Sequence, residues 1–252
     1  MATHIILFYI FVFLYGIVIG SFLNVCIYRI PKKESVVAVG SHCMYCDHRL
    51  AWYELFPLFS FLFLKGRCRY CGTKLPIQYP VVEFVNGMLY LVVFAVDGIN
   101  LQSVLYCFLS SALLVLSVVD YRTLEIPIQV NAIILAIGIV HLVLDYTNFI
   151  HYVIGFFSAS LFLLLCLILT KGKGIGGGDI KLMAVAGLCL GWVNILLALA
   201  VGCVVGSIIQ LIVIAVTKNK TKFAMGPYLS IGIFIAMLWG DSFLDWYMGL
   251  LI

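Results

Sequence analysis

Long uncharged apolar runs alternate with short polar segments along most of the chain. A helix needs about 20 apolar residues to cross the roughly 30 Å hydrocarbon core of a bilayer. Four runs come close to this length, at residues 5–28, 98–119, 126–144 and 146–170, and two shorter or less clean runs lie at 81–96 and 223–240. The pattern therefore predicts an integral membrane protein built from helices.

A seventh run, residues 182–217, is uncharged over 36 residues. At about 1.5 Å per residue it is too long for one crossing. We expect a turn at Gly191-Trp192-Val193-Asn194, which divides the run into two short helices. The predicted fold is an all-α polytopic membrane protein with about eight transmembrane helices.

Composition and charge support this topology. Of the 252 residues, 64% are hydrophobic and 10% are charged, whereas soluble domains carry about 25% charged residues. With eight crossings, all fifteen Lys and Arg residues fall in alternate loops, at 29–80, 120–125, 171–181 and 217–222. Because basic loops stay in the cytoplasm, these loops are expected to be cytoplasmic and both termini external. The basic residues are scattered over short loops, so we expect no nucleic-acid partner.

The only sizeable polar segment, residues 29–80, contains two C-x-x-C pairs, Cys43/Cys46 and Cys68/Cys71, separated by 21 residues. Two such pairs are typical of a zinc site with four thiolates. Disulfides are the alternative, but cytoplasmic thiols stay reduced. Four thiolates leave no open coordination position, so the expected zinc is structural. It would stabilise a segment too small for a substantial core.

Two aspartates are predicted at the cytoplasmic edge of the membrane. Asp120 follows the run 98–119, and Asp179 ends the glycine-rich stretch Gly176-Gly177-Gly178-Asp179. Asp120 could be an ordinary helix-end carboxylate paired with Arg122, but a second carboxylate at the same depth favours a functional pair. Charged groups so close to hydrocarbon are costly and usually functional.

Two neighbouring carboxyls do not both ionise easily, so one can act as a base while the other donates a proton. This predicts hydrolysis of a peptide bond in a membrane-bound substrate. An ion- or proton-coupled transporter is the first alternative, although its site would lie nearer the midplane. A third interpretation is a zinc scaffold with a membrane anchor.

Two further polar residues lie near the cytoplasmic edge. Asn24 ends the first run, where it could serve helix packing or the site. Glu83 lies just after Pro80, at the start of the second run, where it could interact with the helix dipole or face the site.

The chain resembles the type IV prepilin peptidases, which are aspartyl membrane proteases with a Gly-x-Gly-Asp motif. The resemblance covers nearly the whole chain. The segments that match the family are Gly20-Ser-Phe-Leu-Asn-Val25, both C-x-x-C pairs, Tyr79-Pro-Val-Val-Glu83, Asp120-Tyr-Arg122, Ile126-Pro127, Gly176-Gly-Gly-Asp179-Ile-Lys181 and Gly226-Pro-Tyr-Leu229.

The resemblance implies that Asp120 and Asp179 are the catalytic pair of an aspartic endopeptidase in the bacterial inner membrane. The implied substrate is a prepilin or pseudopilin, cut on the cytoplasmic side after a short basic leader. Many members with the cysteine segment also methylate the new N-terminus with S-adenosylmethionine, and Gly66, Asn24 and Glu83 are candidates for this activity. The expected organisation is a first transmembrane helix (1–28), a cytoplasmic zinc domain (29–80) and a seven-helix protease core (81–252).

Overall fold

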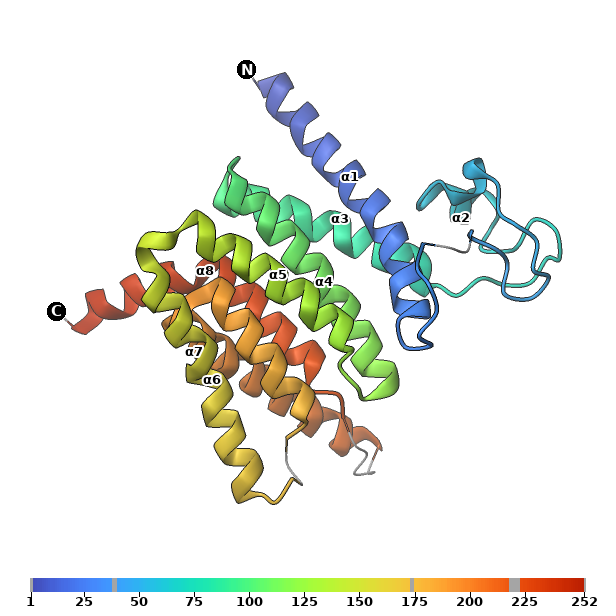
Figure 1. Cartoon of the computed structure of the whole chain (residues 1–252). Helices are drawn as coiled ribbons and strands as arrows, with labels where there is room; N and C mark the ends of the chain where they lie inside the picture. The colour runs from blue at the N-terminus through green and yellow to red at the C-terminus, as the bar shows by residue number, and fades with distance from the viewer. Residues whose placement is uncertain (1, 38–39, 173–174, 218–222, 252) are drawn as a thin grey trace. The chain divides into compact units, whose positions relative to one another are not determined.

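The computed structural model describes residues 2–37, 40–172, 175–217 and 223–251. Within these ranges the chain is almost entirely helical and has no β-strand (Figure 1). The helices are α1 (Ala2–Arg29), α2 (Phe59–Phe63), α3 (Gln78–Asp97), α4 (Leu101–Thr123), α5 (Ile128–Leu144), α6 (Phe149–Leu169), α7 (Gly177–Thr217) and α8 (Gly226–Leu251), with 3-10 turns η1 (Trp52–Leu55) and η2 (Tyr146–Asn148). The all-α fold class is confirmed. Four basic residues used to predict the topology lie outside the described ranges: Lys173, Lys218, Lys220 and Lys222.

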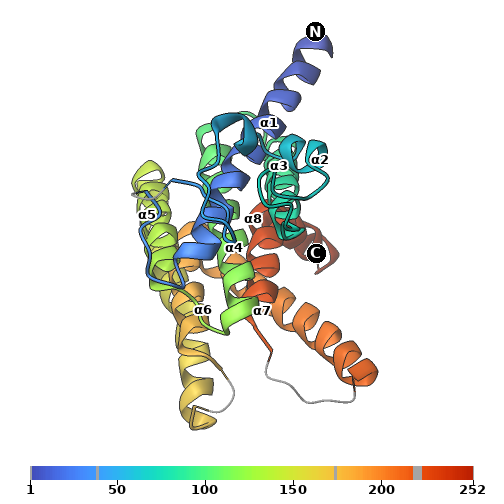
Figure 2. The same cartoon turned by 90° about the vertical axis from the view of Figure 1, so that its right-hand side faces the viewer.

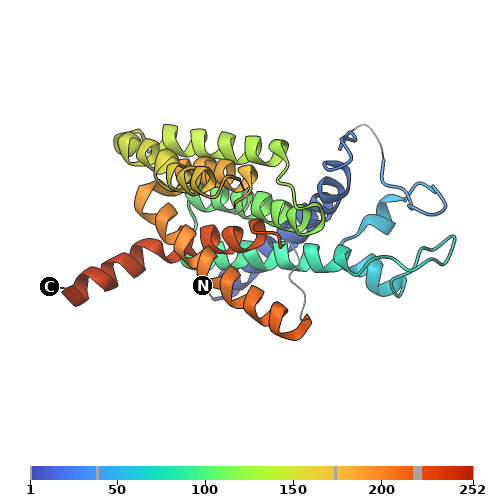
Figure 3. The same ribbon diagram turned by 90° about the horizontal axis from the view of Figure 1, so that it is seen from below.

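Among the described residues, six helices are long and apolar enough to cross a membrane, and α5 is a shorter apolar helix of 17 residues. One of the six, α7, is 41 residues long and is interrupted at Gly191, whose φ of 77° and ψ of 176° are not helical. Figures 2 and 3 show the two halves of α7 running in different directions. Counting both halves and α5 gives the eight expected helices, and the predicted turn at 191–194 is a kink at Gly191.

Several predicted boundaries were wrong by a few residues. Helix α4 begins at Leu101 rather than 98, because Asn100 caps it by accepting the Ser103 N–H at 2.7 Å. It continues past Asp120 to Thr123 and ends through Leu124, whose φ is 56°. Helix α4 therefore ends before Pro127, which is the N-terminal cap residue of α5. Helix α8 continues to Leu251 instead of ending near residue 240.

The chain forms two compact units, residues 1–99 and 100–252. In the first unit α1 and α3 pack against each other in antiparallel fashion, through small residues that let the backbones approach closely. A Cβ on Gly16 would lie 2.7 Å from the Cα of Gly87, and the Asn86 side chain donates a 2.7 Å hydrogen bond to the Gly16 carbonyl. The three-part division expected from the sequence stays a prediction.

The second unit is a bundle of five helices. Helix α7 packs against α5, α6 and α8, and α4 packs against α5 and α8. The contact between α6 and α7 is backbone against backbone, because a Cβ on Gly155 would lie 2.4 Å from the Gly187 carbonyl oxygen. This packing fixes the first half of α7, which begins with the aspartate motif.

Candidate active site and metal-binding cluster

Asp120 lies in the last turn of α4, and its side chain is buried. Its Oδ2 accepts a hydrogen bond from the backbone N–H of Gly226 at 2.8 Å. Gly226 is the first residue of α8, whose first N–H groups have no acceptor inside the helix. A Cβ at position 226 would lie 2.7 Å from the same carboxylate oxygen, so the contact requires glycine. In the sequence Gly226 was singled out only as part of the family segment Gly226-Pro-Tyr-Leu229.

Asp179 lies in the first turn of α7 and is also buried. Its Oδ2 accepts the Gly176 backbone N–H at 3.2 Å, and its own N–H donates to the Gly176 carbonyl at 3.1 Å. Gly178 packs against Ile126, since a Cβ there would lie 2.9 Å from the Cβ of Ile126. A carboxylate at a helix N-terminus is favoured by the helix dipole. The glycine-rich turn therefore holds Asp179 in one orientation.

The structure brings Asp120 and Asp179 to one cavity of about 350 Å³. Ile126 and Asn131 also line it. In both aspartates the described hydrogen bond reaches Oδ2, which leaves Oδ1 of each carboxyl for a ligand. Both carboxyls can therefore contact a ligand in this cavity.

Sequence reasoning missed Asn131. This residue of α5 is buried, and neither its Nδ2 nor its Oδ1 has a hydrogen-bond partner among the described residues. A buried amide left unpaired costs about 1–3 kcal/mol for each missing bond. An amide that offers both a donor and an acceptor can bind a peptide backbone. A polar residue in the first turn of a largely apolar helix was the available signal.

The four cysteines of the C-x-x-C pairs form one cluster in the first unit, with sulfurs within 4.8 Å of one another. The two pairs are folded alike. The Asp47 N–H donates to the Cys43 carbonyl at 3.0 Å, and the Gly72 N–H donates to the Cys68 carbonyl at 2.9 Å. Both Asp47 and Gly72 have positive φ. Each pair therefore forms a tight turn that points two sulfurs to the same place.

This cluster could hold a metal ion. Four sulfurs arranged tetrahedrally at a Zn–S distance of about 2.3 Å lie roughly 3.8 Å apart. The Cys43 and Cys71 sulfurs are 3.8 Å apart. The donor set and its spacing therefore fit zinc.

The three other candidate residues from the sequence lie in the same unit as the cysteines. Asn24 is buried, donates to the Tyr79 carbonyl at 3.1 Å and accepts from the Gln78 side chain at 3.4 Å. It therefore joins the end of α1 to the start of α3. Glu83 is buried in α3 and accepts the backbone N–H of Leu58 at 2.8 Å, just before α2.

Gly66 has a φ of 67° and lies against the ring of Phe61 in α2. Each of the three residues thus has a position within the first unit.

Comparison with known proteins finds matches in both units. The model of the Type IV leader peptidase family matches residues 107–211, and that of the Bacterial Peptidase A24 N-terminal domain matches residues 14–96. A Prepilin leader peptidase/N-methyltransferase of Aeromonas salmonicida (strain A449) is 31% identical, with 96% of this chain and 94% of the relative covered. The chain belongs to the type IV leader peptidase family.

Two further relatives carry the same name. That of Bacillus subtilis (strain 168) is 30% identical, with 94% of this chain and 96% of the relative covered. That of Pseudomonas putida is 30% identical, with coverage of 90% and 89%. No solved structure matches the chain. The family match to residues 107–211 includes both aspartates, and the match to residues 14–96 includes all four clustered cysteines.

Proposed function

We propose that this leader peptidase removes the short basic leader of prepilins or pseudopilins, with Asp120 and Asp179 as its catalytic pair. The observation that carries the proposal is that both aspartates line one cavity and that the backbone N–H of a glycine fixes each of them. All relatives reported above are named for peptidase and methyltransferase activities, and none is named for transport. The transporter alternative therefore has no support.

The pair acts with one carboxyl protonated and the other charged, since two close carboxyls do not both ionise easily. The charged carboxyl takes a proton from water as the water oxygen forms a bond to the peptide carbonyl carbon. The protonated carboxyl gives its proton to the carbonyl oxygen. When the C–N bond breaks, the leaving nitrogen takes a proton from the pair, and no covalent enzyme intermediate is needed. The Asn131 amide binds the substrate backbone beside the pair.

The substrate is itself a membrane protein in this proposal, cut on the cytoplasmic side of the bacterial inner membrane. The distribution of Lys and Arg supports this orientation, because the loops that contain them alternate with loops that contain none. Both aspartates belong to helix ends next to such loops. The leader of the substrate then remains in the cytoplasm, the side of the membrane on which positively charged residues are favoured.

The second proposed activity is N-methylation of the new N-terminus. S-adenosylmethionine supplies the methyl group, which moves from sulfur to the amine nitrogen as the amine loses a proton. Zinc held by Cys43, Cys46, Cys68 and Cys71 stabilises the segment between α1 and α3 in this proposal. Gly66, Asn24 and Glu83 support the methyl-donor site.

The test incubates the purified protein, in detergent, with a prepilin and labelled S-adenosylmethionine, and reads the product by intact mass. The Asp120→Asn and Asp179→Asn variants are expected to leave the prepilin uncut, while the wild type gives a shortened, methylated product. The matched control is Asp245→Asn, an exposed carboxylate in α8, which should cut normally. Full cleavage by either active-site variant would disprove the pair. Cleavage without methylation would restrict the proposal to the peptidase.

A further inference from the structure

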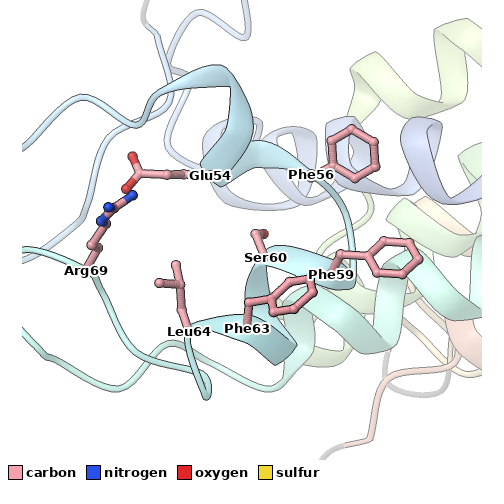
Figure 4. A pocket seen from close by; sticks show the side chains of 7 residues that line it. All are labelled: Glu54, Phe56, Phe59, Ser60, Phe63, Leu64 and Arg69. Carbon is pink, nitrogen blue, oxygen red and sulfur yellow. The ribbon is translucent and has the colours of Figure 1, made fainter.

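The segment between the two C-x-x-C pairs has a cluster of exposed apolar side chains. Leu55 in η1, Phe56 in the following turn, and Phe59, Leu62 and Phe63 in α2 are all exposed, and Phe63 is 83% exposed. The three phenylalanines line a cavity of about 470 Å³ (Figure 4). Clustered apolar side chains outside the long apolar helices indicate a binding surface. We call these five side chains the apolar surface.

One hydrogen bond fixes the depth of this surface along α3. The Leu58 N–H, just before α2, donates to Glu83 Oε2 at 2.8 Å. Glu83 lies five residues after the start of α3, about 7.5 Å along the helix axis. All 20 residues of α3 span about 30 Å, which is the thickness of the hydrocarbon core. The start of α2 is therefore level with the edge of the hydrocarbon.

Helix α1 gives the same depth. A Cβ on Gly20 would lie 2.7 Å from the Cα of Glu83, and Gly20 lies nine residues, or about 13 Å, before the end of α1. The Asn24 side chain donates to the Tyr79 carbonyl at 3.1 Å, between Glu83 and the end of α1. Both membrane helices thus extend past the level of Glu83. Leu58 lies beside them and not beyond their ends.

The charges that follow the apolar surface match anionic lipid headgroups. Residues 55–74 contain no acidic residue and four basic ones, Lys65, Arg67, Arg69 and Lys74. Of these, Lys65 and Arg67 follow α2 directly and are exposed. Basic residues close to a membrane surface attract anionic lipids. Apolar side chains followed by exposed basic ones are typical of segments that lie in the membrane interface.

We propose that the apolar surface docks into the membrane leaflet at this end of α1 and α3, and that it prefers anionic lipids. In Figure 4 Phe56 and Phe59 lie at one end of the cavity, and Glu54 and Arg69 lie at the other. Lipid covers the end with the rings, and the charged end stays in water. Because the second C-x-x-C pair follows α2 directly, this contact holds the metal-binding cluster at the membrane surface.

The experiment places the photoreactive residue p-benzoylphenylalanine at position 63 of the full-length protein. The protein is irradiated in nanodiscs that contain equal amounts of phosphatidylcholine and phosphatidylglycerol, and intact mass is measured. We expect a mass increase of one phospholipid. The matched control places the same residue at position 45, because Tyr45 is 71% exposed in the first C-x-x-C pair but lies outside the apolar surface. It should give at most about a tenth of the lipid adduct.

The same masses report the charge preference. Adducts with phosphatidylglycerol should exceed those with phosphatidylcholine at least about threefold, and the double variant Lys65→Gln, Arg67→Gln should reduce this ratio to about one. Equal yields of the two adducts in the wild-type background would overturn the anionic preference. Absence of a lipid adduct at position 63, or equal adducts at positions 63 and 45, would overturn the docking surface.

Two other results would also overturn it. A cross-link from position 63 to residues 100–252, or to a second copy of the chain, would show that protein and not lipid covers the apolar surface. None of these readouts depends on prepilin cleavage or methylation, so the docking surface can fail while the proposed activities stand. Zinc content and prepilin cleavage, measured separately, establish that each variant is correctly folded.

Discussion

The hydrogen bond between Gly226 and Asp120 gives a direct test of how the active site is held. In Gly226→Ala the new Cβ would lie 2.7 Å from Asp120 Oδ2 and 3.0 Å from Leu116 Cδ2. Both distances are shorter than ordinary contacts, so the carboxylate or the start of α8 must move and weaken the 2.8 Å bond. A hydrogen bond to a charged group contributes about 1.5–3 kcal/mol. Loss of this amount lowers the cleavage rate by roughly 10- to 100-fold.

The assay is prepilin cleavage, followed by intact mass under conditions where the chemical step limits the rate. Alanine is a better helix former than glycine, so a loss of activity cannot be attributed to a weaker helix. The control is Gly249→Ala in the same helix, where an added Cβ meets nothing within 4 Å. Wild-type cleavage by Gly226→Ala, or an equal loss in the control, would refute the reasoning.

Three further predictions concern other groups of the two units. Gly178→Ala should reduce the rate of prepilin cleavage strongly, because its Cβ would lie 2.9 Å from the Cβ of Ile126. Gly177→Ala is the control and should cleave nearly normally, because a Cβ there meets nothing within 4 Å. Equal cleavage rates in the two variants would contradict this prediction. Asn131→Leu should raise the free energy of unfolding, measured by calorimetry, by about 1–3 kcal/mol. It should also raise KM for prepilin, measured by cleavage kinetics. If neither quantity changes, Asn131 does not bind the substrate backbone. Cys43→Ser should release zinc, measured by atomic absorption, and should reduce methylation more than cleavage. A zinc-free variant with full methylation would contradict the proposed role of the metal.

The fold was largely readable from the sequence because membrane helices are long and uncharged. The lengths of the apolar runs predicted eight helical segments. Gly191 indicated where the longest run bends. Helix ends were less predictable. Helix α4 ends through the left-handed Leu124, although leucine rarely adopts positive φ, so no residue preference indicated this end.

The site was only partly readable for a different reason. Asp120, Asp179 and the four cysteines have charges or sulfurs that are conspicuous in apolar or short segments. The groups that orient the aspartates are backbone N–H groups, which every residue type except proline has, so the sequence placed Gly226 in a family segment but did not indicate its bond to Asp120.

The shortness of two helices beside the aspartates has a consequence for the surrounding lipid. The first half of α7, residues 177–190, spans only about 21 Å, and α5, with 17 residues, spans about 26 Å. Both are shorter than the roughly 30 Å of hydrocarbon in a typical bilayer. Lipid accommodates short helices by local thinning, so water and headgroups are drawn toward the aspartates. Acyl chains of greater length resist this thinning, so we expect the composition of the host membrane to affect the rate of cleavage.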